Sequence, residues 1–174
     1  MFFRVEVFGL ENIPKKGSCI LACNHYSNLD PPLVGAFIRR DDLYFMGKEE
    51  LFKLFGLRQF MHFLGVFPVR RGMADVRALK NTFDILNKGH IILMFPEGTR
   101  RKPNRKIAHK KGIGMISSKA KVEIIPIKLE NTNKYFKLKK MRIIVGKPIK
   151  IDHVNNKDYI EISRYVLDRI EDLK

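Results

Sequence analysis

A histidine and an aspartate in one short loop carry the most specific chemistry that this sequence suggests. His25 and Asp30 are five residues apart, after the apolar run at residues 19–23 and directly before Pro31-Pro32. The apolar run predicts a buried strand, and Asp before proline is typical of a helix start, where the carboxylate accepts from free N–H groups of the first turn. The carboxylate can also fold back onto the imidazole, fix its tautomer and stabilise its protonated form. The pair therefore predicts a general base without a nucleophile of its own.

A purely structural interpretation of this loop is also open, with a packed histidine and an aspartate that only caps the helix. The nearby cysteines add no nucleophile. Cys19 and Cys23 lie four residues apart, so on one strand they point the same way about 13 Å apart, too far for a disulfide. We predict two reduced, packed thiols in a cytosolic protein.

The elements that must position this loop alternate between strands and helices. Apolar periodicity and turn residues predict strands at residues 3–9, 19–23, 43–46, 65–72, 90–95, 122–129 and 141–145, and helices at 31–40, 74–88, 112–119 and 156–173. The 174 residues contain no linker or repeat, so we predict one α/β domain, 1–174, with a mixed, mostly parallel sheet flanked by helices. Pro126 predicts that its strand lies at a sheet edge or ends there.

The charge balance favours an anionic partner. Lys and Arg number 34 against 18 Asp and Glu, a formal net charge of +16, which suits nucleic acid, an anionic membrane surface or a phosphorylated substrate. Residues 100–111 and 134–150 each hold seven cations and no acid. The sequence has no RNP-like aromatic pair, no KH-type GXXG loop and no zinc-finger spacing, so charge alone supports nucleic acid binding. We expect no nucleic acid partner.

Residues 51–67 form an unusually apolar segment. A helix that is apolar nearly all round is explained either by burial in the core or by burial elsewhere, in lipid or against an acyl chain, and both explanations stay open. No apolar stretch reaches the length of a membrane span, and no signal peptide is visible. We therefore predict a peripheral protein at the cytoplasmic face of the cell membrane.

Four motifs follow one another along the chain: Asn24-His25-x4-Asp30, Gly65-Val66-Phe67-Pro68-Val69-Arg70-Arg71, Phe95-Pro96-Glu97-Gly98-Thr99-Arg100 and Ile124-Ile125-Pro126-Ile127. In this order they resemble the four blocks of the glycerolipid acyltransferases, most closely the bacterial 1-acyl-sn-glycerol-3-phosphate acyltransferases. The resemblance extends from about residue 4 to residue 151, with the catalytic blocks within 22–130. It implies a glycerol-3-phosphate acyltransferase-like fold.

The resemblance also implies a reaction. A fatty acyl group would pass from a thioester, acyl-CoA or acyl-carrier protein, to the sn-2 hydroxyl of lysophosphatidate, making phosphatidic acid for phospholipid biosynthesis. His25 would be the general base, Asp30 would orient it, and Lys48 would steer the thioester carbonyl. The glycerol phosphate would be held by Arg71, Glu97, Gly98, Thr99 and Arg100. No metal or cofactor is expected, since a thioester is already activated and no residues cluster with metal-ligand spacing.

Three alternatives accompany this prediction. An acyltransferase of the same fold could use another lysolipid acceptor, because the motifs define the chemistry better than the head group. A basic nucleic-acid-binding protein has only charge in its favour, and a lipid-binding module that has lost catalysis conflicts with intact His25 and Asp30. Many bacterial relatives carry an apolar or amphipathic helical segment before the first strand. We expect either a truncated start here or anchoring through 51–67 and the two basic stretches.

Overall fold

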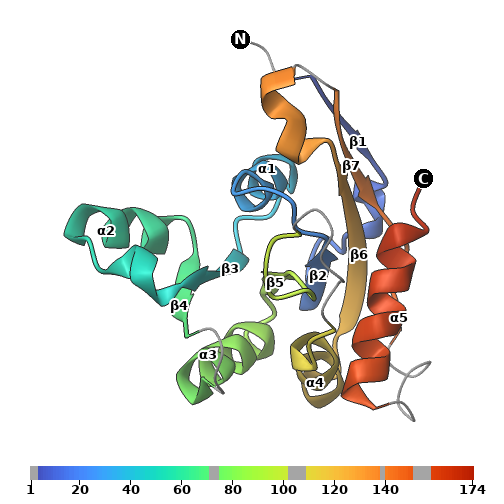
Figure 1. The fold of residues 1–174 in the computed structure, drawn as a ribbon. Coiled ribbons are helices and arrows are strands. Elements are labelled where there is room, and N and C mark those ends of the chain that lie inside the picture. Colours follow the sequence, from blue (N-terminus) through green and yellow to red (C-terminus); the bar gives the residue numbers. More distant parts are fainter. Residues whose placement is uncertain (1–3, 71–74, 102–108, 138–139, 151–157) are drawn as a thin grey trace.

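One seven-stranded sheet organises the chain. The computed structural model describes residues 4–70, 75–101, 109–137, 140–150 and 158–174. The sheet order is β1-β7-β6-β2-β5-β3-β4 (Figure 1). The strands are β1 (Val5–Phe8), β2 (Cys19–Cys23), β3 (Leu43–Lys48), β4 (Val66–Val69), β5 (Ile91–Met94), β6 (Glu123–Glu130) and β7 (Met141–Val145). All neighbours run parallel except β6 and β7, which confirms the predicted mixed, mostly parallel sheet.

Helices cover both faces of this sheet. Helices α3, α4 and α5 pack against one face and α1 against the other (Figure 1). The α-helices are α1 (Asp30–Phe37), α2 (Phe55–Phe63), α3 (Val76–Asn87), α4 (Gly112–Ala120) and α5 (Tyr159–Glu171). Three 3-10 helices, η1 (Leu10–Asn12), η2 (Glu49–Phe52) and η3 (Thr132–Lys137), complete the described elements.

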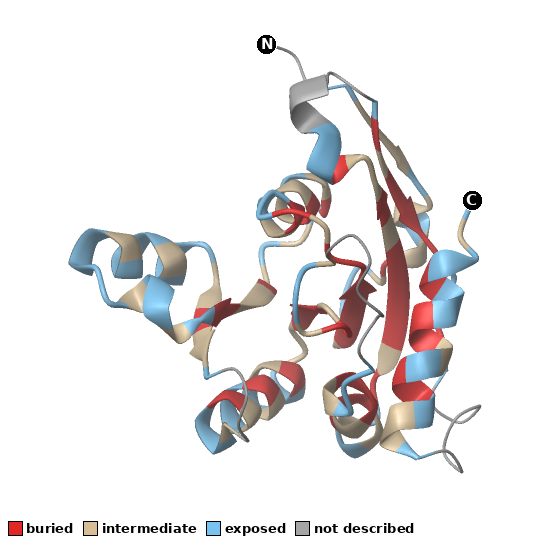
Figure 2. Cartoon of the chain, in the orientation of Figure 1, coloured by how far each residue is buried: buried red, intermediate tan, exposed pale blue. Residues whose placement is uncertain are grey.

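Strand β2 lies at the centre of the core, and all five of its residues are buried (Figure 2). Side chains alternate across a strand, so Ile20 and Ala22 pack with α3, α4 and α5 while Leu21 packs on the side of α1. Cys19 and Cys23 share the side of Leu21, and both are free and buried. The prediction of two packed thiols is therefore confirmed.

Pro126 marks neither a sheet edge nor the end of its strand, which continues to Glu130, so the prediction is wrong. Strand β6 is interior, between β7 and β2, and Pro126 pairs in register with Ala22. The proline is tolerated because its carbonyl, on the side facing β7, accepts from Gly146 N at 2.8 Å just beyond the end of β7. The regular β6–β7 ladder starts only at Ile127, so the missing N–H costs no ladder bond there.

Helix α1 ends at Phe37 rather than at residue 40, because Ile38 is extended. Arg40 instead ties neighbouring loops together. Its guanidinium donates to Pro14 O at 2.8 Å and from Nε to Asp42 Oδ1 at 2.8 Å. This side-chain hydrogen bond from Arg40 holds the pKa of the Asp42 carboxyl below its ordinary value.

Most of the apolar segment at 51–67 is not core, although Phe67, in β4, is buried. The segment divides into the end of η2, helix α2 and the start of β4, and no residue of α2 is buried (Figure 2). The explanation by core burial is therefore wrong for α2. Within the described ranges, no helix has both the length and the apolar character needed to cross a bilayer.

Candidate active site

The loop between β2 and α1 holds His25 at the carboxyl end of the central strand. Asn24 holds this loop against β6, because its side-chain amide makes the two hydrogen bonds that the backbone of a neighbouring strand would make. Its Nδ2 donates to Leu129 O at 2.9 Å, and its Oδ1 accepts from Leu129 N at 2.7 Å. Because Asn24 is buried and both its polar atoms are paired, the next residue, His25, starts from a rigid position.

His25 and Asp30 form a buried pair. His25 Nδ1 lies 2.8 Å from Asp30 Oδ2, and Asp30 is fully buried while His25 is 7% exposed. The same Asp30 oxygen accepts from the backbone N–H groups of Tyr26 at 2.6 Å and Ser27 at 2.7 Å. With Nδ1 directed at the carboxylate, Nε2 is the ring nitrogen that can accept a proton from a substrate.

Asp30 is the first residue of α1 and does not cap it through its side chain. We predicted bonds to N–H groups of the first helical turn, and this is wrong. The carboxylate turns back to the preceding loop, because the N–H groups of Tyr26 and Ser27 converge on it there. Its second oxygen, Oδ1, is buried and has no partner among the described residues. All three hydrogen bonds that the described residues make to this carboxylate therefore fall on the oxygen that faces His25.

The loop after β5 forms the other side of the site. Strands β2 and β5 are neighbours, with Ala22 in register with Met94, so the loops that follow them meet at one sheet edge. The Phe95 ring stacks on the His25 imidazole, with centroids 4.0 Å apart and planes inclined by 20°. His25 N also donates to Glu97 Oε1 at 3.3 Å. The imidazole is therefore held by its ring face, its Nδ1 atom and its backbone.

Glu97 is neutralised inside the protein by Arg101. Arg101 Nε lies 2.9 Å from both Glu97 oxygens, and its backbone N donates to His25 O at 2.7 Å. The guanidinium also donates to Tyr26 Oη at 3.0 Å and pairs with Glu171 at the end of α5. Burial disfavours the charge of Arg101, but the bonds to Glu97 and Glu171 outweigh it and raise its pKa above the ordinary arginine value. Arg101 therefore links the histidine loop, the Glu97 loop and α5.

The remaining predicted residues lie around this core. Gly98 has a left-handed φ of +68°, and Thr99 and Arg100 are exposed just beyond it. Lys48 is exposed at the carboxyl end of β3, with its ammonium 2.8 Å from Glu50. Arg71 lies outside the described residues. The structure thus brings His25, Asp30 and Glu97 into one cluster and leaves Thr99 and Arg100 open to solvent at its rim.

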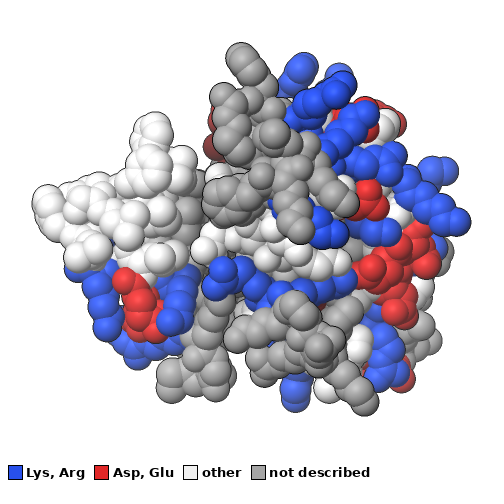
Figure 3. All heavy atoms as spheres, turned by 45° about the horizontal axis from the view of Figure 1, so that its top comes forward, with Lys and Arg blue, Asp and Glu red and all other residues white. Residues whose placement is uncertain are grey.

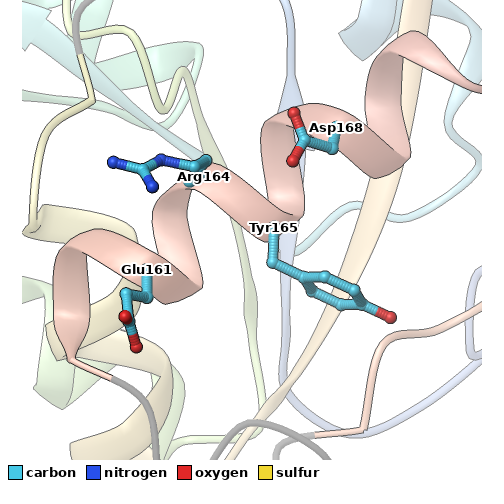
Figure 4. A pocket seen from close by; sticks show the side chains of 4 residues that line it. All are labelled: Glu161, Arg164, Tyr165 and Asp168. Carbon is cyan, nitrogen blue, oxygen red and sulfur yellow. The ribbon is translucent and has the colours of Figure 1, made fainter.

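A polar hollow of about 420 Å³ lies beside the histidine loop. It is lined by Tyr26, Lys128, Leu129, Glu130, Asn131, Asn133 and Lys134. Lys128 is anchored there by the Glu171 and Leu173 carbonyls at 2.7 and 2.8 Å. A second hollow, of about 220 Å³, is lined only by Glu161, Arg164, Tyr165 and Asp168 of α5 (Figure 4). Of the two, the first adjoins the candidate site, through Tyr26.

Cys23 is two residues from His25 but is unsuited to be a nucleophile. Burial, and then the charges of Asp30 and Glu97, raise the pKa of its thiol well above the ordinary value. The thiolate is the reactive form of cysteine, and it is suppressed at neutral pH. The thiol is therefore a packed side chain, as predicted.

Sequence reasoning missed three contributors to this site: Asn24 as the clamp to β6, Phe95 as the ring partner, and Arg101. Asn24 and Phe95 belong to motifs that were recognised, but their contacts are not local. Arg101 was counted only as one cation of a basic stretch. Its position four residues after Glu97 was the available signal, whereas Glu171 is 70 residues away in sequence.

Comparisons with known proteins agree with this arrangement. A family model described as Acyltransferase matches residues 4–130. The 1-acyl-sn-glycerol-3-phosphate acyltransferase of Bacillus subtilis is 28% identical over 148 residues, covering 83% of this chain and 73% of that protein. A chloroplastic 1-acyl-sn-glycerol-3-phosphate acyltransferase of Brassica napus is 31% identical over 160 residues, covering 85% of this chain and 46% of that protein.

A solved structure shows the same fold. The crystal structure of the 1-acyl-sn-glycerophosphate (LPA) acyltransferase PlsC from Thermotoga maritima matches with a TM-score of 0.79 and 28% identity. The match covers 97% of this chain and 69% of that one. Against the Brassica protein the chain spans less than half of the relative's length. Since the family model matches well over half of the chain, around the buried histidine–aspartate pair, the protein belongs to the acyltransferase family.

Proposed function

We propose that this chain transfers a fatty acyl group from an acyl thioester to the sn-2 hydroxyl of 1-acyl-glycerol-3-phosphate, making phosphatidic acid. The observation that carries the proposal is the buried contact of 2.8 Å between His25 and Asp30. It is supported by the motif order, by the family and by relatives named for this reaction. Acyl-CoA and acyl-carrier protein are both proposed as donors.

In the proposed mechanism, His25 Nε2 takes the proton of the sn-2 hydroxyl while the hydroxyl oxygen attacks the thioester carbonyl carbon. The C–S bond then breaks, and the leaving thiolate takes the proton from the imidazolium, so that ester and thiol are the products. Asp30 accepts from Nδ1–H throughout and stabilises the charged ring. General-base help of this kind contributes a factor of about 10²–10⁴. The rest must come from positioning the hydroxyl against the carbonyl.

The phosphate end of the acceptor is proposed to bind at the rim of the site. Arg100 is exposed there, with a planar fork that suits phosphate oxygens, whereas Arg101 is engaged by Glu97 and Glu171. Thr99 and Gly98 offer a hydroxyl and an accessible backbone beside it. Lys48 and Arg71 keep their proposed roles toward the thioester and the phosphate. Glu97 is better suited to hold the loop than to contact an anionic substrate, because it is itself an anion.

We propose no metal or cofactor, since the thioester supplies an activated acyl group. The lipid acceptor makes an anionic membrane surface the proposed working place, on the cytoplasmic side of the cell membrane. The net charge of +16 agrees with this, because each cation near such a surface contributes about 1 kcal/mol.

A thiol-release assay tests the reaction. Purified protein with anionic vesicles, acyl-CoA and lysophosphatidate should release free thiol only when the acceptor is present. His25→Ala should lower the rate by about 10²–10⁴. His90→Ala is the matched control, because His90 faces Asp42 beside the amino end of β5. Thiol release without acceptor, or full activity of His25→Ala, would contradict the proposal.

An acceptor panel tests the head group. Lysophosphatidate should react faster than lysophosphatidylcholine or monoacylglycerol, and each acceptor should be run with both donors. Arg100→Ala should lower the acceptor kcat/KM by about tenfold or more, mainly through KM. The control is Arg39→Ala, which replaces another exposed arginine, two residues beyond the end of α1. Equal rates with monoacylglycerol would refute the phosphate contact and favour another acceptor.

A further inference from the structure

Helix α2 exposes an apolar surface that the described fold does not cover. The exposed fractions are 68% for Leu54, 82% for Phe55, 54% for Phe60 and 86% for Phe63, and Leu64 is also exposed. We call these five residues the apolar wedge. Large apolar side chains grouped on one short segment are unusual on a solvent-facing surface and mark a site of interaction.

The wedge is distinct from the side of α2 that packs on the protein. Leu57 and Met61 are four residues apart, so they share one side of the helix, and both are partly buried. Phe60 and Phe63 are three apart and share another side, which is exposed. Helix α2 stands apart from the body of the fold, joined to it through η2 and β4 (Figure 1). The packing of α2 therefore leaves the wedge open.

The charges around the wedge suit an anionic surface. Helix α2 contains no acid, and the exposed cations Arg58 and Lys53 lie on or beside it. The acids of η2 are matched by the ion pairs Arg70–Glu49 and Lys48–Glu50. The region over α2, at the left of Figure 3, is mostly uncharged, and directly below it lysine and arginine flank a small acidic patch. Phenylalanine and leucine with neighbouring cations are the composition of helices that lie in a membrane interface.

A second copy of the chain is the weaker candidate for an occupant. Two molecules of charge +16 repel each other, whereas an anionic bilayer attracts each of them.

The position of the wedge also favours a bilayer. Helix η2 follows directly on the carboxyl end of β3, and the loops with His25 and Glu97 follow the carboxyl ends of β2 and β5 in the same parallel set.

We infer that the apolar wedge inserts into the outer acyl region of an anionic lipid bilayer and so brings the His25 edge of the sheet to its lipid acceptor. The choice of a lipid surface rests on the proposed function. Each inserted phenylalanine ring should tighten partitioning by about tenfold or more. The wedge is thus the element that docks the enzyme, while the cations beside it favour anionic head groups.

Tryptophan fluorescence tests this inference, because the chain contains no tryptophan. Phe63→Trp places the only indole in the wedge, and Phe8→Trp places it on β1, at the opposite edge of the sheet. Both are made in the His25→Ala background, so that binding is measured without turnover. Phosphatidylglycerol–phosphatidylcholine vesicles should shift the emission of the first protein to the blue, and brominated acyl chains should quench it. The second protein should show neither effect.

Vesicle sedimentation of Phe60→Ala/Phe63→Ala, with Phe8→Ala as the control, should show about a hundredfold weaker binding. Equal binding by the double variant, or vesicle binding with no shift at position 63, would overturn the inference. A blue shift without vesicles that grows with protein concentration would also overturn it, in favour of self-association. If the wild-type protein turns over substrate but the emission of the Phe63→Trp protein does not shift, the proposed function stands and the membrane inference fails. If that emission shifts but the wild-type protein shows no turnover, the membrane inference stands and the proposed function fails.

Discussion

Replacement of Asp30 separates its charge from its role as a hydrogen-bond acceptor. One Asp30 oxygen accepts from His25 Nδ1 and from the N–H groups of Tyr26 and Ser27, all within 2.8 Å. In Asp30→Asn, an amide oxygen at the same place can still accept these bonds, but the negative charge is gone. In Asp30→Ala, the two loop N–H groups lose their acceptor as well. Asn therefore tests the charge, and Ala tests the loop.

The expected loss of activity in Asp30→Asn follows from the strength of the hydrogen bond between His25 and Asp30. A hydrogen bond to a charged group contributes about 1.5–3 kcal/mol, and part of this is expressed only when the imidazole is protonated. Loss of the whole contribution would lower kcat by about 10- to 150-fold, because 1.36 kcal/mol corresponds to a factor of ten, so Asp30→Asn should lower kcat by a factor of up to this range. Asp30→Ala should in addition destabilise the fold by about 1–3 kcal/mol for each loop N–H left buried without a partner.

The assay is thiol release at saturating acyl-CoA and lysophosphatidate, with urea unfolding followed by circular dichroism as the measure of stability. A double variant supplies the sharpest control. Since Asp30 acts through His25, Asp30→Asn should have little further effect on the residual rate of His25→Ala. If it lowers that rate by the same factor as in the wild type, the carboxylate acts independently of the imidazole and our reasoning is refuted.

Three further predictions concern groups around the site. Cys23→Ala should keep the thiol-release rate within a few-fold of wild type, because the raised pKa of this thiol suppresses its thiolate. An acylated intermediate that mass spectrometry detects in the wild type and not in Cys23→Ala would contradict this. Arg101→Met should destabilise the protein by about 3–5 kcal/mol, since Glu97 is left buried without its cationic partner. Glu171→Gln should cost about 1 kcal/mol or less, because that ion pair is exposed. Equal losses of stability in urea unfolding would show that Glu97 is not the main partner of Arg101. Asp42 has a lowered pKa when folded, so the unfolded chain binds the proton first, and stability should fall as pH drops below about 4. Asp42→Asn should flatten this slope in unfolding curves between about pH 2 and 5, and an unchanged slope would contradict it.

Much of the fold could be predicted from sequence because its signals are local. The buried run of β2, the helix start at Asp30-Pro31 and the periodicity of α3 and α5 depend on near neighbours in the chain. The acyltransferase prediction, which is confirmed, used short motifs of consecutive residues, in strands as well as in loops. The roles predicted for the individual site residues stay predictions.

Contacts between distant segments could not be predicted in this way. The interior position of Pro126 depends on where β7 begins to pair with β6, and the second partner of Arg101, Glu171, arrives on the last helix. The exposure of Phe60 and Phe63 depends on which side of α2 packs against the fold. The sequence pattern of an apolar helix is the same whether the helix faces a core or a membrane. The sequence by itself determined the order of elements and the residues able to do chemistry. Only the tertiary structure decided which charges meet and which apolar face stays open, because register and packing act between parts of the chain that are far apart in sequence.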